Sequence, residues 1–411
     1  METEIASLLL DCLHQDESRI SAARLAALSP ADWQLFLALA KEQKVDSLLY
    51  HRLTSRGWAE AVPAEVLSTL QAAYHANAVK NLRLQSELAS VVAALHDGEI
   101  PVIALKGAHL ALAVYDQPAL RMMTDLDLLV PTRDLETAAA ILEAQGYRPL
   151  QPYKVGVNFK TIYRHLPRFV KPQAIPIELH WNIASPVLAH CIDPAELWER
   201  AVPLHLADVD ALGLSVEDLL LHLCYHTSYP HQFEFGLRPS CDIAELIRHH
   251  GEALAWPQVV QRTQRWQWER GVYLALRLAQ ELVGAAVPEK VLRELRPAAL
   301  DESLVTTARM QIFTEKRLTS TISRNMTELW GSQGLKGKLR AFWHSLFLPK
   351  AILAKQYAVH PDSPKLYLYY PVRLKDMLAR YWRVTLKLYR GDPALTPMAQ
   401  RKTALQKWLA E

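Results

Sequence analysis

Apolar side chains in the first hundred residues recur every three to four positions, which is the spacing of helices that pack on one face. Ser29, Pro30 and Asp32 form a helix start signal, because Ser caps the first turn, Pro suits its first position and Asp favours the positive helix end. This helix is expected to end near Glu42. A longer helical pattern covers residues 63–96 and stops at an Asp-Gly pair.

Between residues 101 and 181 the pattern changes to short apolar runs, which predict strands. Helical spacing returns twice within this stretch, and the second of these helices stops at Gly146. Strands alternating with helices in so short a stretch predict a small α/β unit. The expected strands are residues 101–105, 124–130, 157–164 and 175–181, and the expected helices are residues 108–115 and 133–145.

Helical patterns resume after residue 215, where Ser215 followed by Glu217 and Asp218 has the spacing of a capped first turn. Further helices are expected at residues 242–250 and between residues 256 and 295. Glycines between residues 331 and 337 indicate a linker. The expected parts are an N-terminal helical region (1–97), an α/β domain (98–212), a helical domain packing on it (213–330) and a basic, aromatic-rich helical region (331–411).

The composition is that of an ordinary globular protein. Half of the 411 residues are hydrophobic and 22% are charged, which excludes a disordered or fibrous chain. The four cysteines are widely scattered, so a reducing, cytoplasmic setting is expected rather than a disulfide framework. No run of about 18 apolar residues occurs, so no transmembrane segment is expected.

The net charge of +3 hides a basic C-terminal segment. Residues 311–411 carry 18 Lys and Arg against six Asp and Glu, with aromatic residues between them. Such a segment can attract an anionic partner, namely nucleic acid, a polyphosphorylated acceptor or a lipid surface. A packed aromatic core with a solvated basic exterior is the simpler interpretation.

Two carboxylates stand out in the second expected strand. Asp125 and Asp127 are two positions apart, so both side chains project from the same face. Their flanking leucines indicate a buried strand, in which adjacent negative charges repel strongly. A divalent cation would relieve this repulsion, and paired carboxylate oxygens suit Mg²⁺ bound beside substrate phosphates.

Two neighbouring features strengthen this interpretation. Lys106 and Gly107 lie at a strand-to-helix turn, where backbone can approach a ligand closely and helix N–H groups can bind phosphate. Glu178 is a third carboxylate, within another apolar run. The simpler alternatives are a plain connection at the turn and a surface Glu on an edge strand.

Together these motifs resemble the bacterial uncharacterised nucleotidyltransferase family, within the superfamily that has a polymerase-β-type palm. The motifs, in chain order, are Leu105-Lys106-Gly107, Arg121 with Asp125-Leu126-Asp127, and Glu178-Leu179-His180-Trp181, followed by Asp218, His222, His226, Arg238 and Asp242. The resemblance implies an α+β fold, in which a small mixed-sheet nucleotidyltransferase palm is flanked by N-terminal and C-terminal helical regions.

The resemblance also implies transfer of a nucleoside monophosphate from an NTP, expected to be ATP, to an acceptor, with release of pyrophosphate. Asp125 and Asp127 would hold two Mg²⁺ ions, and Glu178 would complete one metal site or accept the acceptor's proton. The acceptor stays open among a small molecule, a peptide, a protein and RNA. The alternative is a non-catalytic nucleotide-binding or scaffold protein that keeps the fold.

The phosphates would be held at the turn. Gly107 and the backbone amides after it would cradle them, while Lys106 and Arg121 would neutralise the departing pyrophosphate. The wider superfamily usually has a small polar residue or a second glycine where this chain has Ala108, so a hydroxyl contact to the triphosphate is missing here.

The remaining candidates are substrate-binding residues. His222 and His226 share one helix face and would contact base, ribose or acceptor, as would His180. A satisfied semi-buried pair and a zinc site are the alternatives for the two helical histidines. Arg238 and Asp242 are also four apart, and they are expected either to form a structural ion pair or to contact substrate.

Overall fold

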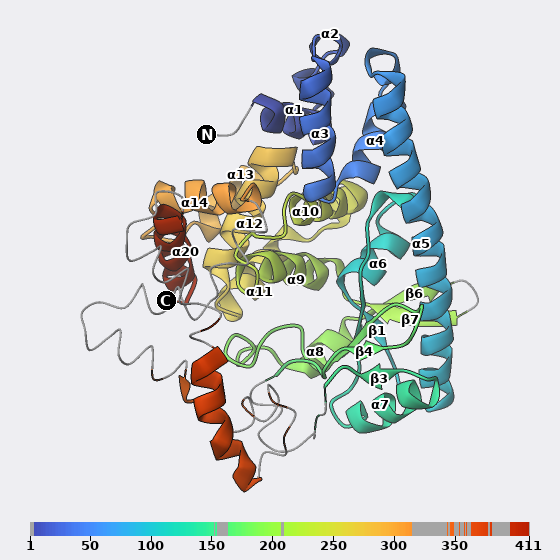
Figure 1. Ribbon diagram of the computed structural model, residues 1–411, viewed down its shortest axis with the longest axis vertical. Helices are drawn as coiled ribbons and strands as arrows, with labels where there is room; N and C mark the ends of the chain where they lie inside the picture. The colour runs from blue at the N-terminus through green and yellow to red at the C-terminus, as the bar shows by residue number, and fades with distance from the viewer. Residues whose placement is uncertain are drawn as a thin grey trace.

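The computed structural model consists of helices packed around one mixed β-sheet (Figure 1). It describes residues 4–151, 153, 163–206, 209–314, 363–376 and 395–410, together with residues 343, 346–348, 353, 357, 359 and 379. Residues 157–162 of the strand expected at 157–164 and most of the basic C-terminal region, including the glycines at 331–337, lie outside the described residues.

The N-terminal region is helical, as the sequence predicts. Ser29 and Asp32 form the expected capping box, in which Ser29 Oγ accepts the Asp32 N–H and the Asp32 carboxylate accepts the Ser29 N–H. The helices are α1 (Glu4–Leu13), α2 (Ala22–Ala26), α3 (Pro30–Glu42), α4 (Asp46–Ser55) and α5 (Ala64–Asp97), with 3-10 turns at Glu17–Arg19 and Ala59–Ala61.

Helix α5 has 34 residues and runs along one side of the molecule, from the N-terminal helices to the sheet (Figure 1). Its first half places Val66 and Leu70 in the hydrophobic core of the helical regions. Its second half places Leu88 and Val92 in the separate core beneath the sheet. One continuous helix therefore joins the two cores.

The sheet has seven strands in the order β3-β4-β5-β2-β1-β7-β6. The central pairs β2·β5 and β1·β7 are parallel, whereas β1·β2, β4·β5, β3·β4 and β6·β7 are antiparallel. The strands are β1 (Ile103–Ala104), β2 (Leu126–Leu129), β3 (Arg148–Pro149), β4 (Phe169–Val170), β5 (Ile177–His180), β6 (Val202–Leu206) and β7 (Val209–Gly213).

The sequence patterns found the central strands but missed the sheet's edges. Runs 101–105, 124–130 and 175–181 contain β1, β2 and β5, but the β6–β7 hairpin and the two-residue strands β3 and β4 carry no clear apolar run. The connecting helices are α6 (Lys106–Ala113), α7 (Leu135–Ala144) and α8 (Pro194–Glu199), with a 3-10 turn at Pro118–Leu120.

The downstream helices form a bundle beside the sheet. They are α9 (Val216–Ser228), α10 (Arg238–His250), α11 (Trp256–Arg265), α12 (Glu269–Val283), α13 (Glu289–Leu295) and α14 (Glu302–Ile312), with α20 (Leu395–Ala410) and 3-10 turns at Gly251–Ala253 and Pro364–Leu368. Ser215 caps α9 as predicted. Helix α10 begins four residues earlier than the expected start at residue 242, because Pro239 suits its first turn.

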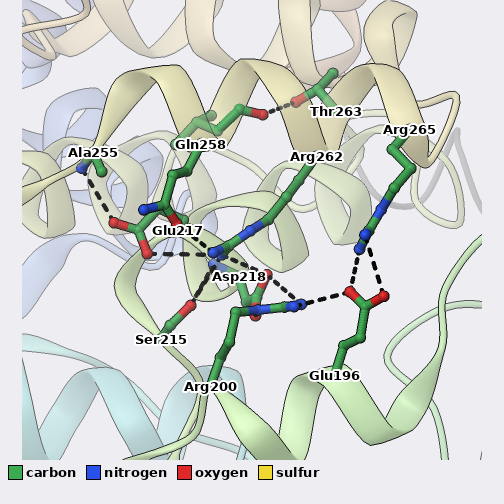
Figure 2. A network of polar contacts seen from close by, with 11 residues as sticks. Glu196, Arg200, Ser215, Glu217, Asp218, Ala255, Gln258, Arg262, Thr263 and Arg265 are labelled. Carbon is green, nitrogen blue, oxygen red and sulfur yellow. Dashed lines mark hydrogen bonds and ion pairs between the residues drawn. The ribbon is translucent and has the colours of Figure 1, made fainter.

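An ion-pair network centred on Asp218 connects the end of α8 to the helical bundle (Figure 2). Asp218 is fully buried in α9 and accepts from Arg200 Nε and from Arg262 Nη1, each at 2.9 Å. Arg200 follows α8 and also binds Glu196, while Arg262 comes from α11. One carboxylate thus joins three helical segments.

Two further expectations concern cysteines and membrane spans. All four cysteines are free. Among the described residues, no helix is long and apolar enough to cross a bilayer.

Candidate active site

The site is built on the pairing of the two central parallel strands. Asp127 on β2 lies in register with Glu178 on β5, between neighbours such as Leu126 and Leu128 that are fully buried. Asp125 directly precedes β2, so its side chain emerges beside that of Asp127. All three carboxylates line one cavity of about 380 Å³.

Asp127 is buried and held by two basic side chains. Its Oδ1 lies 2.7 Å from Lys106 Nζ and 2.9 Å from His180 Nε2. Burial raises the pKa of Asp127, but the Lys106 charge and the His180 hydrogen bond outweigh burial and leave that pKa well below its usual value. Asp127 is therefore an ionised carboxylate at neutral pH.

Lys106 adopts an unusual backbone conformation to reach Asp127. Its φ is +44°, a left-handed value that is strained for a residue with a side chain. It starts helix α6 and is buried with its ammonium on Asp127. Lys106, expected from the sequence to neutralise the departing pyrophosphate, is therefore already paired with Asp127.

Asp125 and Glu178 share one cation that the sequence did not reveal. Arg168 Nη2 lies 3.0 Å from Asp125 Oδ2 and 2.9 Å from Glu178 Oε1. Burial raises the pKa of Glu178, whereas hydrogen bonding to His180 and the nearby His165 lower it to a net value of about 2. The repulsion expected among the three carboxylates is therefore relieved by basic side chains in this structure.

The donor set fits a divalent cation. Ligand atoms of Asp127, Glu178 and His180 lie within 4.8 Å of one another. Carboxylate oxygens suit Mg²⁺, and the His180 nitrogen is a donor more typical of softer metals. A cation bound to the carboxylates would compete with the Lys106 and Arg168 ion pairs, so metal binding and these pairs are coupled.

Arg121 is fixed by a different partner from the one expected. Its Nε and Nη2 form a bidentate pair with Asp242 at 2.9 and 3.0 Å, and Tyr115 Oη donates to the same carboxylate. The expected Arg238–Asp242 ion pair is wrong, because Arg121 and Tyr115 already bind Asp242 and Arg238 donates instead to the Met122 carbonyl.

Gly107 makes room for Arg121. A Cβ on Gly107 would collide with Arg121 Nη1, so only a residue without a side chain lets the guanidinium lie against the turn. Ala108, next along α6, is buried in the core beneath the sheet with Leu126 and Leu128. Its methyl group packs where a hydroxyl would need a partner, which explains an apolar residue at this position.

The histidines of α9 lie close to the site in different ways. His226 lines the cavity, whereas His222 is buried behind it. Burial, with Lys106 as the next cause, holds the pKa values of both well below the usual range, so both are neutral. The residues described contain one cluster that could hold a metal, and it does not include them.

Several cavity residues were not predicted. Phe235 stacks on His231 with ring centroids 3.8 Å apart, and Lys44 Nζ lies 5.9 Å from the centroid of the Phe235 ring. Left-handed φ values at Lys44 and Phe233 mark strained turns here, but no sequence pattern identifies such residues as strained. The charged and aromatic lining residues missed by sequence reasoning are Lys44, Arg164, His165, Arg168, His231 and Phe235.

The predicted residues that do line the cavity are Lys106, Gly107, Arg121, Asp125, Asp127, Glu178, His226, Arg238 and Asp242. Of the others, His180 contacts Asp127 from a fully buried position, and Ala108 and His222 pack around the site. Residues so far apart in sequence converge because the first residues of α6 and α10 and the side chains of Asp127 on β2 and Glu178 on β5 all line the same cavity.

Comparison with known proteins gives one family. Residues 29–284, more than half of the chain, match the family model described as "Uncharacterised nucleotidyltransferase". No curated protein matches the chain significantly.

Proposed function

The chain belongs to the uncharacterised nucleotidyltransferase family, and from this membership and the site geometry we propose that it transfers a nucleoside monophosphate from an NTP to an acceptor, in a Mg²⁺-dependent reaction that releases pyrophosphate. ATP is the expected donor. A hydroxyl on a small molecule, peptide, protein or RNA end would be the acceptor.

The observation that carries this proposal is the register of Asp127 with Glu178 on neighbouring parallel strands, at the wall of a cavity rich in cations. Parallel strands in register bring two carboxylates to one level of the sheet, where they can share a cation. The cations around them provide binding partners for a polyphosphate.

The proposed roles follow from the positions of the side chains. Asp127, Glu178 and Asp125 would hold Mg²⁺, which when bound would neutralise phosphate charge and polarise the phosphorus centre under attack. Lys106 and His180 keep Asp127 ionised and oriented. Glu178 suits a ligand role better than that of a proton acceptor, because a pKa of about 2 makes it a weak base.

A non-catalytic nucleotide-binding protein is the second candidate. It is favoured by the ion pairs of Lys106 with Asp127 and of Arg168 with both Asp125 and Glu178, which partly neutralise the site carboxylates without a metal. The two candidates differ in turnover, since both would bind an NTP.

The test is release of pyrophosphate from each of the four NTPs with Mg²⁺ and a panel of hydroxyl acceptors. Asp127→Asn should abolish release, while Asp210→Asn, which removes an exposed carboxylate from the neighbouring β6–β7 hairpin, should leave it unchanged. Metal-dependent NTP binding without release under any acceptor would instead support the second candidate.

A further inference from the structure

The cavity carries more cations than its own carboxylates can neutralise. Six Lys and Arg side chains and four carboxylates line it. The carboxylates are paired as Asp127 with Lys106, Asp242 with Arg121, and both Asp125 and Glu178 with Arg168. Within the described part of the chain, Arg164 and Arg238 form no ion pair with a carboxylate, although both line the cavity.

Arg238 is partly buried and has unused hydrogen-bonding capacity. Its Nη1 donates to the Met122 carbonyl oxygen at 3.1 Å, whereas its Nε is buried and has no partner among the described residues. Burial lowers the pKa of Arg238, and the neighbouring Arg121 charge lowers it further. A guanidinium whose buried N–H has no partner and which lies beside a second cation is stabilised when an anion joins it.

The start of helix α10 adds to the positive potential. The helix has 13 residues, and its N-cap, Leu237, provides no side-chain cap. Pro239 has no N–H, so Arg238 and Ser240 supply the first N–H groups of this turn, which have no carbonyl partner within a helix. The helix dipole places positive charge at this end. Because Arg238 and Pro239 both line the cavity, this end of α10 opens onto it.

Arg164 provides a second guanidinium on the same cavity. Its Nη1 lies 3.5 Å from Tyr225 Oη and its guanidinium lies over the Tyr225 ring, so the side chain is positioned by an aromatic neighbour and not by an acid. The nearby His231 is neutral, because burial and the Arg164 charge lower its pKa to about 3. Neither neighbour neutralises Arg164.

We propose that Arg238, the N-terminal turn of α10 and Arg164 form a phosphate-binding subsite, separate from the carboxylates that would hold metal. A phosphate offers several strong acceptor oxygens, which match guanidinium groups and helix N–H donors. The source of the phosphate, which is either the polyphosphate of an NTP or a phosphorylated acceptor, rests on the proposed function; the binding itself does not require turnover.

The first experiment measures binding of inorganic pyrophosphate to the full chain by calorimetry, with EDTA present so that the carboxylates hold no metal. Arg238→Gln should weaken pyrophosphate binding at least about tenfold, since a charge-assisted contact is lost. The affinity of Arg238→Lys should lie between those of the wild type and Arg238→Gln. The matched control is Arg248→Gln, which removes the same charge from the other end of α10, where Arg248 binds Glu245. This control should bind as the wild type does.

A second variant keeps the test decisive if Arg238→Gln does not fold. Arg164→Gln should also weaken pyrophosphate binding several-fold, because its charge faces the same cavity. Failure of the wild-type protein to bind pyrophosphate, or affinities within about twofold of wild type in the folded variants, would overturn the subsite.

Competition identifies the source of the phosphate. If ATP displaces pyrophosphate and Arg238→Gln weakens ATP but not AMP, the subsite holds the polyphosphate of the nucleotide. If ATP and pyrophosphate bind together and the variant weakens pyrophosphate alone, the subsite holds a phosphate of the acceptor. Pyrophosphate binding with no NTP turnover would contradict the proposed function and leave the subsite in place.

Discussion

Lys106 Nζ lies 2.7 Å from Asp127 Oδ1, so the cation at the start of α6 neutralises the carboxylate in the middle of the sheet. Both side chains are buried, with 9% and 8% of their surfaces exposed. A pair of this kind is strongly destabilised when one partner is removed, because the other is left as an uncompensated buried charge.

Asp127→Asn should therefore lower the free energy of unfolding by about 3–5 kcal/mol. Adding Lys106→Met should recover much of that loss, because it removes the charge left unpaired. Urea unfolding of the two single variants and the double variant measures the coupling. Equal stability of wild type and Asp127→Asn would show that the Lys106–Asp127 pair contributes nothing to the fold.

Arg168→Ala should strengthen binding of Mg²⁺ about tenfold. Arg168 neutralises both Asp125 and Glu178, so its removal leaves two carboxylates that a dication can satisfy. Calorimetric titration with Mg²⁺ in the absence of nucleotide measures the change. Lys171→Ala removes a nearby cation that pairs with Glu87 outside the site, and should have no effect. Weaker Mg²⁺ binding in Arg168→Ala would mean that this arginine supports the metal site.

The partly buried His231 should make the protein sensitive to mild acid. Its pKa is about 3 in the folded state, because of burial and then of Arg164 and Lys106, against about 6.5 in the unfolded chain. Between these values the unfolded chain takes up a proton that the folded state does not. The free energy of unfolding should therefore fall as pH drops below about 6.5, by up to ~1.4 kcal/mol per pH unit.

His231→Phe tests this, since Phe retains a ring to stack on Phe235 but cannot be protonated. Urea unfolding at pH 7 and pH 5 should show a smaller loss of stability in the variant than in the wild type. His190→Phe, at an exposed histidine, should keep the wild-type pH dependence. An equal loss of unfolding free energy between pH 7 and pH 5 in all three proteins would show that other groups cause the acid sensitivity.

Asp218→Ala should destabilise the protein by about 3–5 kcal/mol, since Arg200 and Arg262 would both lose their shared buried partner. Glu196→Ala, in the same network but partly exposed, should change stability by about 1 kcal/mol or less. Thermal or urea unfolding compares the two. Similar decreases in the free energy of unfolding of both variants would mean that the contribution of Asp218 does not depend on its burial.

The sequence predicted the parts of the site that depend on local pattern. Alternation within two apolar runs placed Asp127 and Glu178 on buried strands, but the parallel pairing of these strands in register was not predicted and appears only in the structure. The capping residues Ser29 and Ser215 were also predicted, because a capping motif is defined by four consecutive residues.

The ion-pair partners of the site residues could not be predicted from local sequence patterns. Arg168 reaches Asp125 and Glu178 from a segment with no distinctive pattern, and Arg121 pairs with Asp242 from 121 positions away. The four-residue spacing of Arg238 and Asp242 suggested a local pair, but the tertiary contact of Asp242 with Arg121 and Tyr115 prevailed. Charge neutralisation in this site is therefore a property of the folded chain.

The turn after α3 contacts the loop that precedes α10. Gln43 Oε1 accepts the N–H of Leu237 at 2.9 Å, and a Cβ on Gly236 would collide with Gln43. The loop that leads into Arg238 is thus seated on the N-terminal helices, which also supply Lys44 to the cavity. A shortened protein that starts at β1 would lose Lys44 from the cavity and the contact that supports the loop before Arg238, while it would keep Asp125, Asp127, Glu178 and Asp242.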